Sequence, residues 1–182
     1  MALLILVAAV VGAALWLVVA KNGFVRLRAE IENAWSQIEV QLKRRYDLIP
    51  NLVETVKGYR DHERETLEAV IEARNRAVAA GNPQEQGVAE GMLGAALGRI
   101  FALAEAYPEL KADANFRQLT EELSNTENRI AYARQHHNDV VTRYNALRLM
   151  FPWSLVATGF GPRDLFDIPD DSAAHEAPSV SF

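Results

Sequence analysis

The sequence predicts an all-α protein, in which an N-terminal transmembrane helix precedes an antiparallel up-down four-helix bundle. Three observations support this prediction. Residues 2–20 contain no charged side chain, two later segments repeat apolar residues at 3-4 spacing, and no segment alternates apolar and polar residues as a half-buried strand does. We therefore expect an anchor over 1–23, a bundle domain over 24–166 and a disordered tail over 167–182.

The apolar run over 2–20 has the length of a membrane span. At about 1.5 Å per residue it forms a helix of about 28 Å, close to the thickness of a bilayer core. A cleaved signal peptide is the alternative, since Val18-Val19-Ala20 offers small residues at a cleavage site. However, no basic side chain precedes the run, and signal peptides usually have a basic start and a shorter apolar core. The sequence therefore favours a retained single-pass anchor that contacts the lipid bilayer through residues 2–20.

Basic residues follow the apolar run directly. Lys21, Arg26 and Arg28 lie just after it, and flanks rich in Lys and Arg stay on the cytoplasmic side. We expect a protein of the cell membrane whose short N-terminus lies outside and whose bundle lies in the cytoplasm.

Composition excludes several classes of function. The chain has no cysteine, which excludes disulfides and thiolate metal sites. The net charge of -5 lacks the basic character that nucleic-acid binding needs, so we expect no nucleic-acid partner.

The clearest helical pattern lies in the C-terminal half. An unbroken seam at 3-4 spacing, typical of coiled-coil packing, predicts one long helix between Pro108 and Pro152. Its members are Phe116, Leu119, Leu123, Thr126, Ile130, Ala133, His137, Val140, Tyr144, Leu147 and Phe151. The FPWSLVATGF segment (151–160) that follows is expected at the bilayer surface, where Trp153 and Phe160 suit the headgroup region.

Three further helices are expected before this one. A seam over 31–56 contains Pro50, which predicts a kink, and ends before Gly58, a plausible C′ glycine. Asp61 is expected to cap a helix over 61–79, and Gly81-Asn82-Pro83 predicts a stop, a cap and the start of a helix over 83–106. A helix unbroken over 24–80 would leave the first seam without a partner, so we expect the chain to turn near Gly58.

Four glycines repeat along one face of the third helix: Gly87, Gly91, Gly94 and Gly98. Each costs about 1 kcal/mol relative to alanine in a helix. Either the stripe lets a neighbouring helix approach closely, or it forms a docking groove for a partner.

Several blocks of the chain resemble those of the LemA family. They are RRYDLIPNLVETVKGY (44–59), AEAYPELKA (104–112), LTEELSNTENRIAYAR (119–134) and YNALRLMFP (144–152). The resemblance implies a bacterial membrane-anchored protein with a short external N-terminus and a helical-bundle domain, but it supplies no established molecular function. The family usually has an aromatic residue before the asparagine, where this chain has His136-His137-Asn138.

The motifs of catalysis are absent from the sequence. There is no Glu-x-x-His pair of a di-iron bundle, no phosphate-binding loop and no nucleophile elbow. We therefore expect no catalytic residue, no cofactor and no metal, and a protein that is not an enzyme.

Two polar residues interrupt the apolar seams. Arg45 must be paired or must reach solvent, and an antiparallel register places it near Glu127. His137 is either a hydrogen-bonded core histidine or part of a metal site or pH switch. Together with Arg44, these residues form a candidate polar seam or ligand site.

Two classes of function remain. The first is a non-catalytic scaffold or adaptor for another membrane or envelope protein. The second is a sensor or ligand-binding domain with a polar pocket between helices, lined by Arg44, Arg45 or His137. The C-terminal Phe182 offers an adaptor a further docking element, because an apolar C-terminus can add to a PDZ-like groove.

Overall fold

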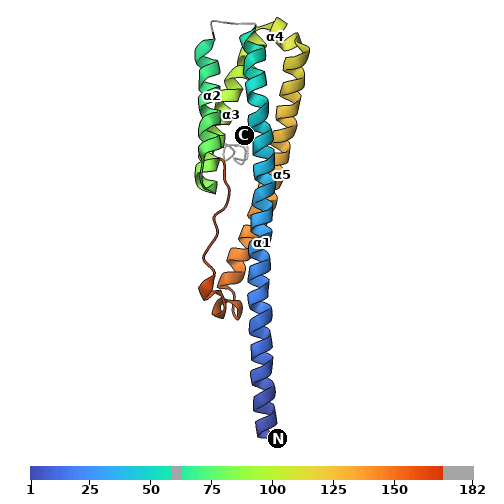
Figure 1. Cartoon of the computed structure of the whole chain (residues 1–182), viewed down its shortest axis with the longest axis vertical. Helices are drawn as coiled ribbons and strands as arrows, with labels where there is room; N and C mark the ends of the chain where they lie inside the picture. The colour runs from blue at the N-terminus through green and yellow to red at the C-terminus, as the bar shows by residue number, and fades with distance from the viewer. Residues whose placement is uncertain (59–62, 170–182) are drawn as a thin grey trace, which may run out of the picture.

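The computed structural model describes residues 1–58 and 63–169, and this part of the chain is helical without any strand (Figure 1). The helices are α1 (Ala2–Lys57), α2 (Arg64–Ala79), α3 (Pro83–Ala106), α4 (Pro108–Ala112) and α5 (Ala114–Leu149). Two 3-10 turns follow, η1 (Trp153–Leu155) and η2 (Ala157–Gly159). The predicted all-α class is therefore confirmed.

Helix α1 contains both the apolar run and the first seam without interruption. Its apolar N-terminal part is long enough to cross a membrane, and none of that window is buried (Figure 1). Beyond the apolar run, α1 packs against α5 from Phe24 to Arg45, and α5 is its most extensive partner. Helix α3 also has the length and composition of a span, but half of its apolar window is buried, as in a core helix.

Pro50 lies inside α1, which continues through it as α-helix. Proline has no N–H, so the carbonyl of Tyr46 loses the donor that residue 50 would supply. Arg74 of α2 replaces this donor, because its Nε lies 3.1 Å from the Tyr46 carbonyl oxygen. The predicted kink site is thus also a point where α2 is fixed to α1.

The helix ends agree in part with the expected caps. The Asn82 side chain accepts from the N–H of Glu85 at 2.9 Å, and Pro83 opens α3, as predicted. Gly58 ends α1, but its φ of −59° is right-handed, so it does not use the left-handed conformation of a C′ glycine. Asp61 lies outside the described residues.

The long C-terminal helix predicted from Pro108 is split in two. The short helix α4 ends before Asp113, whose side chain accepts from the N–H of Phe116 at 2.9 Å and caps α5. The backbone of Asp113 is extended, because an N-cap residue leaves the helical conformation to make this bond. The single long helix therefore begins at Ala114.

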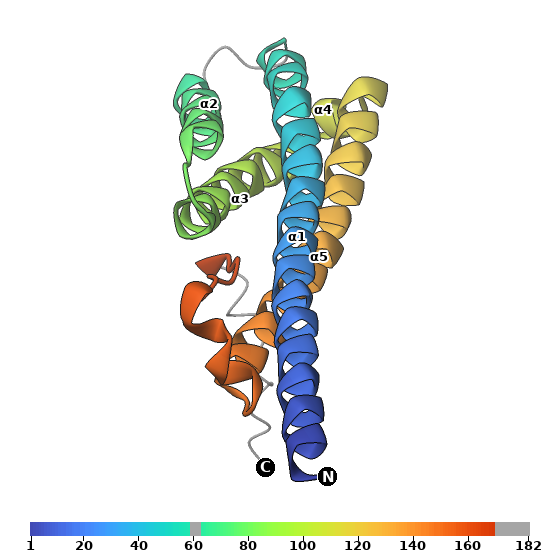
Figure 2. The ribbon, with the colours of Figure 1, turned by 60° about the horizontal axis from the view of Figure 1, so that its bottom comes forward.

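The apolar core forms two clusters along the long axis. The larger one joins α1, α2, α3 and α5 and includes Ile38, Leu52, Leu93 and Leu123. The smaller one lies nearer the apolar part of α1 and is built around Phe24. Figure 2 shows α3 inclined to α1 rather than parallel with it.

After α5 and the 3-10 turns, residues 160–168 run back along the helical domain as an extended strap (Figure 1). Two side-chain amides of α5 hold its backbone. Asn145 contacts the N–H and the carbonyl of Arg163 at 3.1 and 2.7 Å. Asn138 contacts the same two groups of Phe166 at 2.9 and 2.8 Å. Each side-chain amide thus bonds both backbone groups of one strap residue, as the backbone of a neighbouring β-strand would.

The strap ends inside the larger core cluster. Phe166 is fully buried and Ile168 is 8% exposed, so the packed chain extends past the boundary expected at residue 166. Of the tail expected to be disordered over 167–182, residues 170–182 lie outside the described residues.

Candidate functional site

A polar network lies where the long helices meet. Arg45 of α1 bridges two carboxylates, because its Nη1 lies 3.2 Å from Glu90 Oε2 and 2.8 Å from Glu127 Oε2. The Arg45 and Glu90 side chains are 6% and 0% exposed, whereas that of Glu127 is 53% exposed. The ion pair that the register predicts between Arg45 and Glu127 is present, and a buried carboxylate on α3 joins it.

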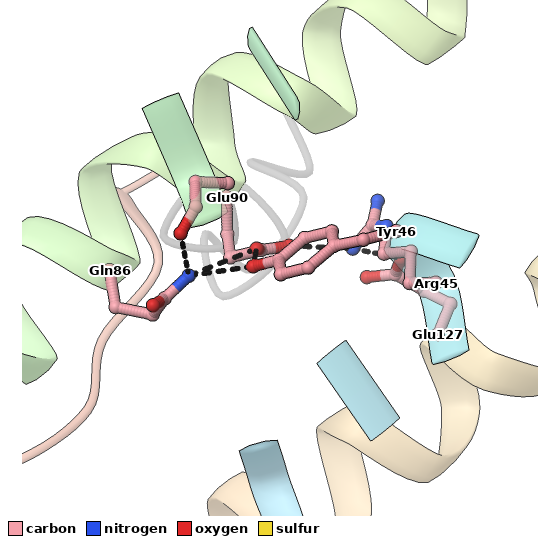
Figure 3. Close-up of polar contacts among 6 residues, drawn as sticks. Arg45, Tyr46, Gln86, Glu90 and Glu127 are labelled. Carbon is pink, nitrogen blue, oxygen red and sulfur yellow. Dashed lines mark hydrogen bonds and ion pairs between the residues drawn. The ribbon is translucent and has the colours of Figure 1, made fainter. Parts of the chain in front are cut away.

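Tyr46 and Gln86 complete this network (Figure 3). The Tyr46 hydroxyl donates to Glu90 Oε1, and Gln86 Nε2 lies 2.8 Å from the hydroxyl oxygen and 3.2 Å from the same carboxylate oxygen. Gln86 Nε2 also lies 3.2 Å from the carbonyl of Ala77 in α2. The junction network, defined as Arg45, Tyr46, Gln86, Glu90 and Glu127, therefore connects α1, α2, α3 and α5.

Burial dominates the electrostatics of the network. It raises the pKa of Glu90, while Arg45 and the hydrogen bonds from Tyr46 and Gln86 oppose that rise. The pKa of Tyr46 is raised by burial and then by the charge of Glu90, which keeps the hydroxyl protonated as a donor. In the junction network the guanidinium of Arg45 thus faces two carboxylates, those of Glu90 and Glu127.

A cleft of about 480 Å³ borders the network between α3 and α5. Its walls combine the apolar Leu97, Phe101 and Leu123 with the polar Ser124 and with Arg45 and Glu127 of the network. Such a cleft can receive a side chain or a small molecule that combines an apolar body with a polar end.

The four glycines of the stripe on α3 do not share one environment. A Cβ at Gly87 would lie 1.8 Å from the carbonyl oxygen of Asp167, so this glycine admits the strap. Gly94 and Gly98 line the cleft, and a Cβ at either would meet nothing within 4 Å. Gly91 is buried. The close approach at Gly87 is therefore made by an extended segment, not by the neighbouring helix that the sequence suggested.

The family model of the LemA family matches residues 34–182, which include the whole junction network and the strap. This chain belongs to the LemA family. A relative named magnetosome protein MamQ 2, from Paramagnetospirillum magneticum, is 26% identical, over 80% of this chain and 64% of its own length. Magnetosome protein MamQ of Magnetospirillum gryphiswaldense is also 26% identical, over 76% of this chain and 61% of its own.

Protein LemA of Metamycoplasma hominis is 28% identical, over 75% of this chain and 63% of its own length. The chain thus spans somewhat less than two thirds of the length of these curated relatives.

The structure does not bring the four predicted polar residues of this LemA-family chain into one pocket. Arg44 faces Glu122 at 3.7 Å, and its side chain is half exposed. His137 lies ten residues beyond Glu127 on α5, about 15 Å along the helix. There its ring packs 5.5 Å from that of Trp35.

His137 is a buried core residue. Its Nδ1 lies 3.3 Å from the Oδ1 of Asn138, the amide that holds the strap. Burial lowers the pKa of the imidazole. The described residues contain no group of three or more His, Cys, Asp or Glu side chains that could hold a metal ion. Phe182, the predicted C-terminal docking residue, lies outside the described residues.

Sequence reasoning missed Glu90 and Gln86, although a signal for both exists. Buried Leu93, Leu97 and Ile100 define a seam on α3 at 4-3 spacing. Extending the seam towards the N-terminus reaches residues 90 and 86. A carboxylate on the core face of an otherwise apolar helix needs a cation, and Arg45 is the cation that interrupts the first seam.

Proposed function

We propose that this LemA-family chain is a membrane-anchored scaffold, in which α1 spans the bilayer once and a cytoplasmic four-helix bundle docks other membrane or envelope proteins. The observation that carries this proposal is the continuity of α1. None of its apolar window is buried, and the same helix continues into the core of the domain. A helix without a hinge fixes the bundle at a set height and angle above the bilayer.

Ring contacts of the apolar run support a retained anchor. The rings of Trp16 and Trp153 lie 5.7 Å apart, and just beyond the run Phe24 stacks on Phe160 at 5.0 Å. Cleavage after Ala20 would remove Trp16 from this packing. The end of the run thus packs against the folded domain, which supports a retained anchor.

Contacts between α1 and α5 support the antiparallel arrangement. Phe24 packs against Tyr144, whereas Arg45 pairs with Glu127. Partner numbers fall along α5 as they rise along α1, as antiparallel helices require.

The charges of the junction network favour a structural role. Glu90 accepts hydrogen bonds at both oxygens, and Arg45 is already balanced by two carboxylates. A sensor that binds anions would need a free cation at this point. The cleft beside Gly94 and Gly98 remains the place where a scaffold can receive a partner.

Position-dependent photo-crosslinking in cells tests this proposal. A photoreactive residue at Ser124, on the cleft, is compared with one at Val40, which is exposed on α1. A scaffold predicts an adduct with a membrane protein from Ser124 and none from Val40. Filling the cleft with Gly98→Trp should abolish the adduct, because a Cβ at Gly98 meets open space and the indole can occupy the cleft.

Two controls separate docking from anchoring. Replacing residues 2–20 by an unrelated apolar span should preserve the adduct, and deleting them should reduce it. Equal adducts from Ser124 and Val40, or an adduct insensitive to Gly98→Trp, would contradict docking in the cleft. Protease digestion of the bundle from outside intact cells would contradict the cytoplasmic orientation.

A further inference from the structure

A contiguous apolar surface follows α5. Leu149, Met150, Phe151 and Leu155 are 80%, 56%, 81% and 63% exposed. We name residues 149–155 the α5 tip. Single exposed apolar residues are common on soluble proteins, but clustered ones mark a surface that something else covers.

The α5 tip lies beside the apolar part of α1, as Figures 1 and 2 show. Trp153 within the tip packs against Trp16, which lies four residues before the end of the apolar run, about 6 Å along the helix. The packing of Phe160 on Phe24 holds the tip at this level. The tip therefore lies level with the last turns of the apolar run rather than above it.

Basic groups lie on the side of the tip that faces the domain. Arg148 directly precedes the tip, and its Nε lies 2.6 Å from the carbonyl oxygen of Phe160. Lys21 follows the apolar run of α1, five residues beyond Trp16, which packs against Trp153 of the tip. An apolar surface with cations above it matches the acyl chains and the phosphates of one bilayer leaflet.

We propose that the α5 tip is a second membrane contact, which inserts shallowly into the leaflet where α1 leaves the bilayer towards the domain. This inference rests on the proposed span of α1. Lipid is the occupant because the exposed surface of the tip is continuous with that of the apolar run through Trp153 and Trp16. Two contacts, one spanning and one interfacial, prevent the domain from tilting about α1.

Single-cysteine spin labelling of the full chain in phosphatidylcholine–phosphatidylglycerol vesicles tests the proposal. The chain contains no cysteine, so each label is unique. The test positions are Phe151→Cys and Leu155→Cys. Val40→Cys is the matched control, because Val40 and Leu155 are both 63% exposed, and Val10→Cys marks the apolar run. The depth of each label is obtained by comparing two collision rates: that with oxygen, which enters lipid, and that with a nickel chelate, which stays in water.

We expect labels at residues 151 and 155 to favour oxygen, at a shallower depth than the label at residue 10, while the label at residue 40 favours the nickel chelate. If the nickel chelate reaches the labels at residues 151 and 155 as readily as the label at residue 40, while the label at residue 10 lies deep in lipid, the tip does not insert. That result would overturn the proposed tip contact and leave the proposed anchor intact. Nickel access at residue 10 would overturn the anchor itself. Protection of 151 and 155 from both reagents would mean that protein covers the tip, which also overturns the proposal.

Discussion

Removing the charge of Arg45 should destabilise the domain severely, because Glu90 would lose its cation. The Glu90 side chain is 0% exposed, and a buried carboxylate left without a partner costs about 3–5 kcal/mol. We therefore expect Arg45→Met to lower the free energy of unfolding by about that amount. Glu127→Ala should cost less than about 1 kcal/mol, since that carboxylate is half exposed and Arg45 keeps its buried partner.

A second substitution separates the charge from the packing. Arg45→Met combined with Glu90→Gln should recover most of the loss, because an amide keeps a polar contact with Tyr46 without a charge. The deficit of Arg45→Met should also shrink as the pH falls. Burial raises the pKa of Glu90, so the folded variant takes up a proton at a pH where the unfolded chain remains ionised. The charge penalty therefore shrinks as the pH falls through the folded pKa, and it is gone below the unfolded pKa.

Urea denaturation of the full chain in detergent micelles, at neutral and mildly acidic pH, measures these differences. If Arg45→Met and Glu127→Ala cost the same, or if Glu90→Gln brings no recovery in the Arg45→Met background, the buried pair of Arg45 and Glu90 does not stabilise the junction.

Three further predictions are tested by the same denaturation assay. Gly87→Ala should cost about 1–3 kcal/mol, because its Cβ would fall 1.8 Å from a backbone oxygen of the strap. Gly94→Ala should instead stabilise α3 by up to about 1 kcal/mol, since a Cβ there meets nothing; effects of the same sign would contradict the division of the stripe. Burial lowers the pKa of His137, so stability should fall as the pH drops below the unfolded value of 6.5. His137→Phe should weaken this loss of stability at low pH, whereas His136→Phe, at the neighbouring exposed position, should not. Leu123→Ala should cost about 2–5 kcal/mol, because Leu123 is 4% exposed, and Glu122→Ala should cost far less; equal losses would show that the core face of α5 is misassigned.

Helix ends that depend on local chemistry could be read from the sequence. Asn82 and Pro83 start α3 as expected, because a cap and a first-turn proline act within one helical turn. Asp113 is a similar local signal, but Pro108 also suits a first helical turn, and the helix start predicted there hides the break before α5. The pairing of Arg45 with Glu127 was also accessible, since helix register alone brings the two together.

Features that depend on tertiary contacts could not be read in the same way. The continuity of α1 through Pro50 is accompanied by a donor from Arg74, on a different helix. The strap is held through its backbone by Asn138 and Asn145, so its own side chains give little signal. Phe166 shows that an apolar residue in a loop-like segment can be part of the core.

We propose that α1 holds the domain rigidly above the bilayer as one continuous helix. The most direct test is the distance between spin labels at Val11→Cys and Val40→Cys, both exposed on α1, in the full chain reconstituted into lipid nanodiscs. Twenty-nine residues of unbroken helix span about 44 Å at about 1.5 Å per residue. We expect one narrow distribution of distances near this value, broadened only by the labels. A broad distribution, or a second population at shorter distances, would show a hinge between the apolar run and the bundle and would contradict the account.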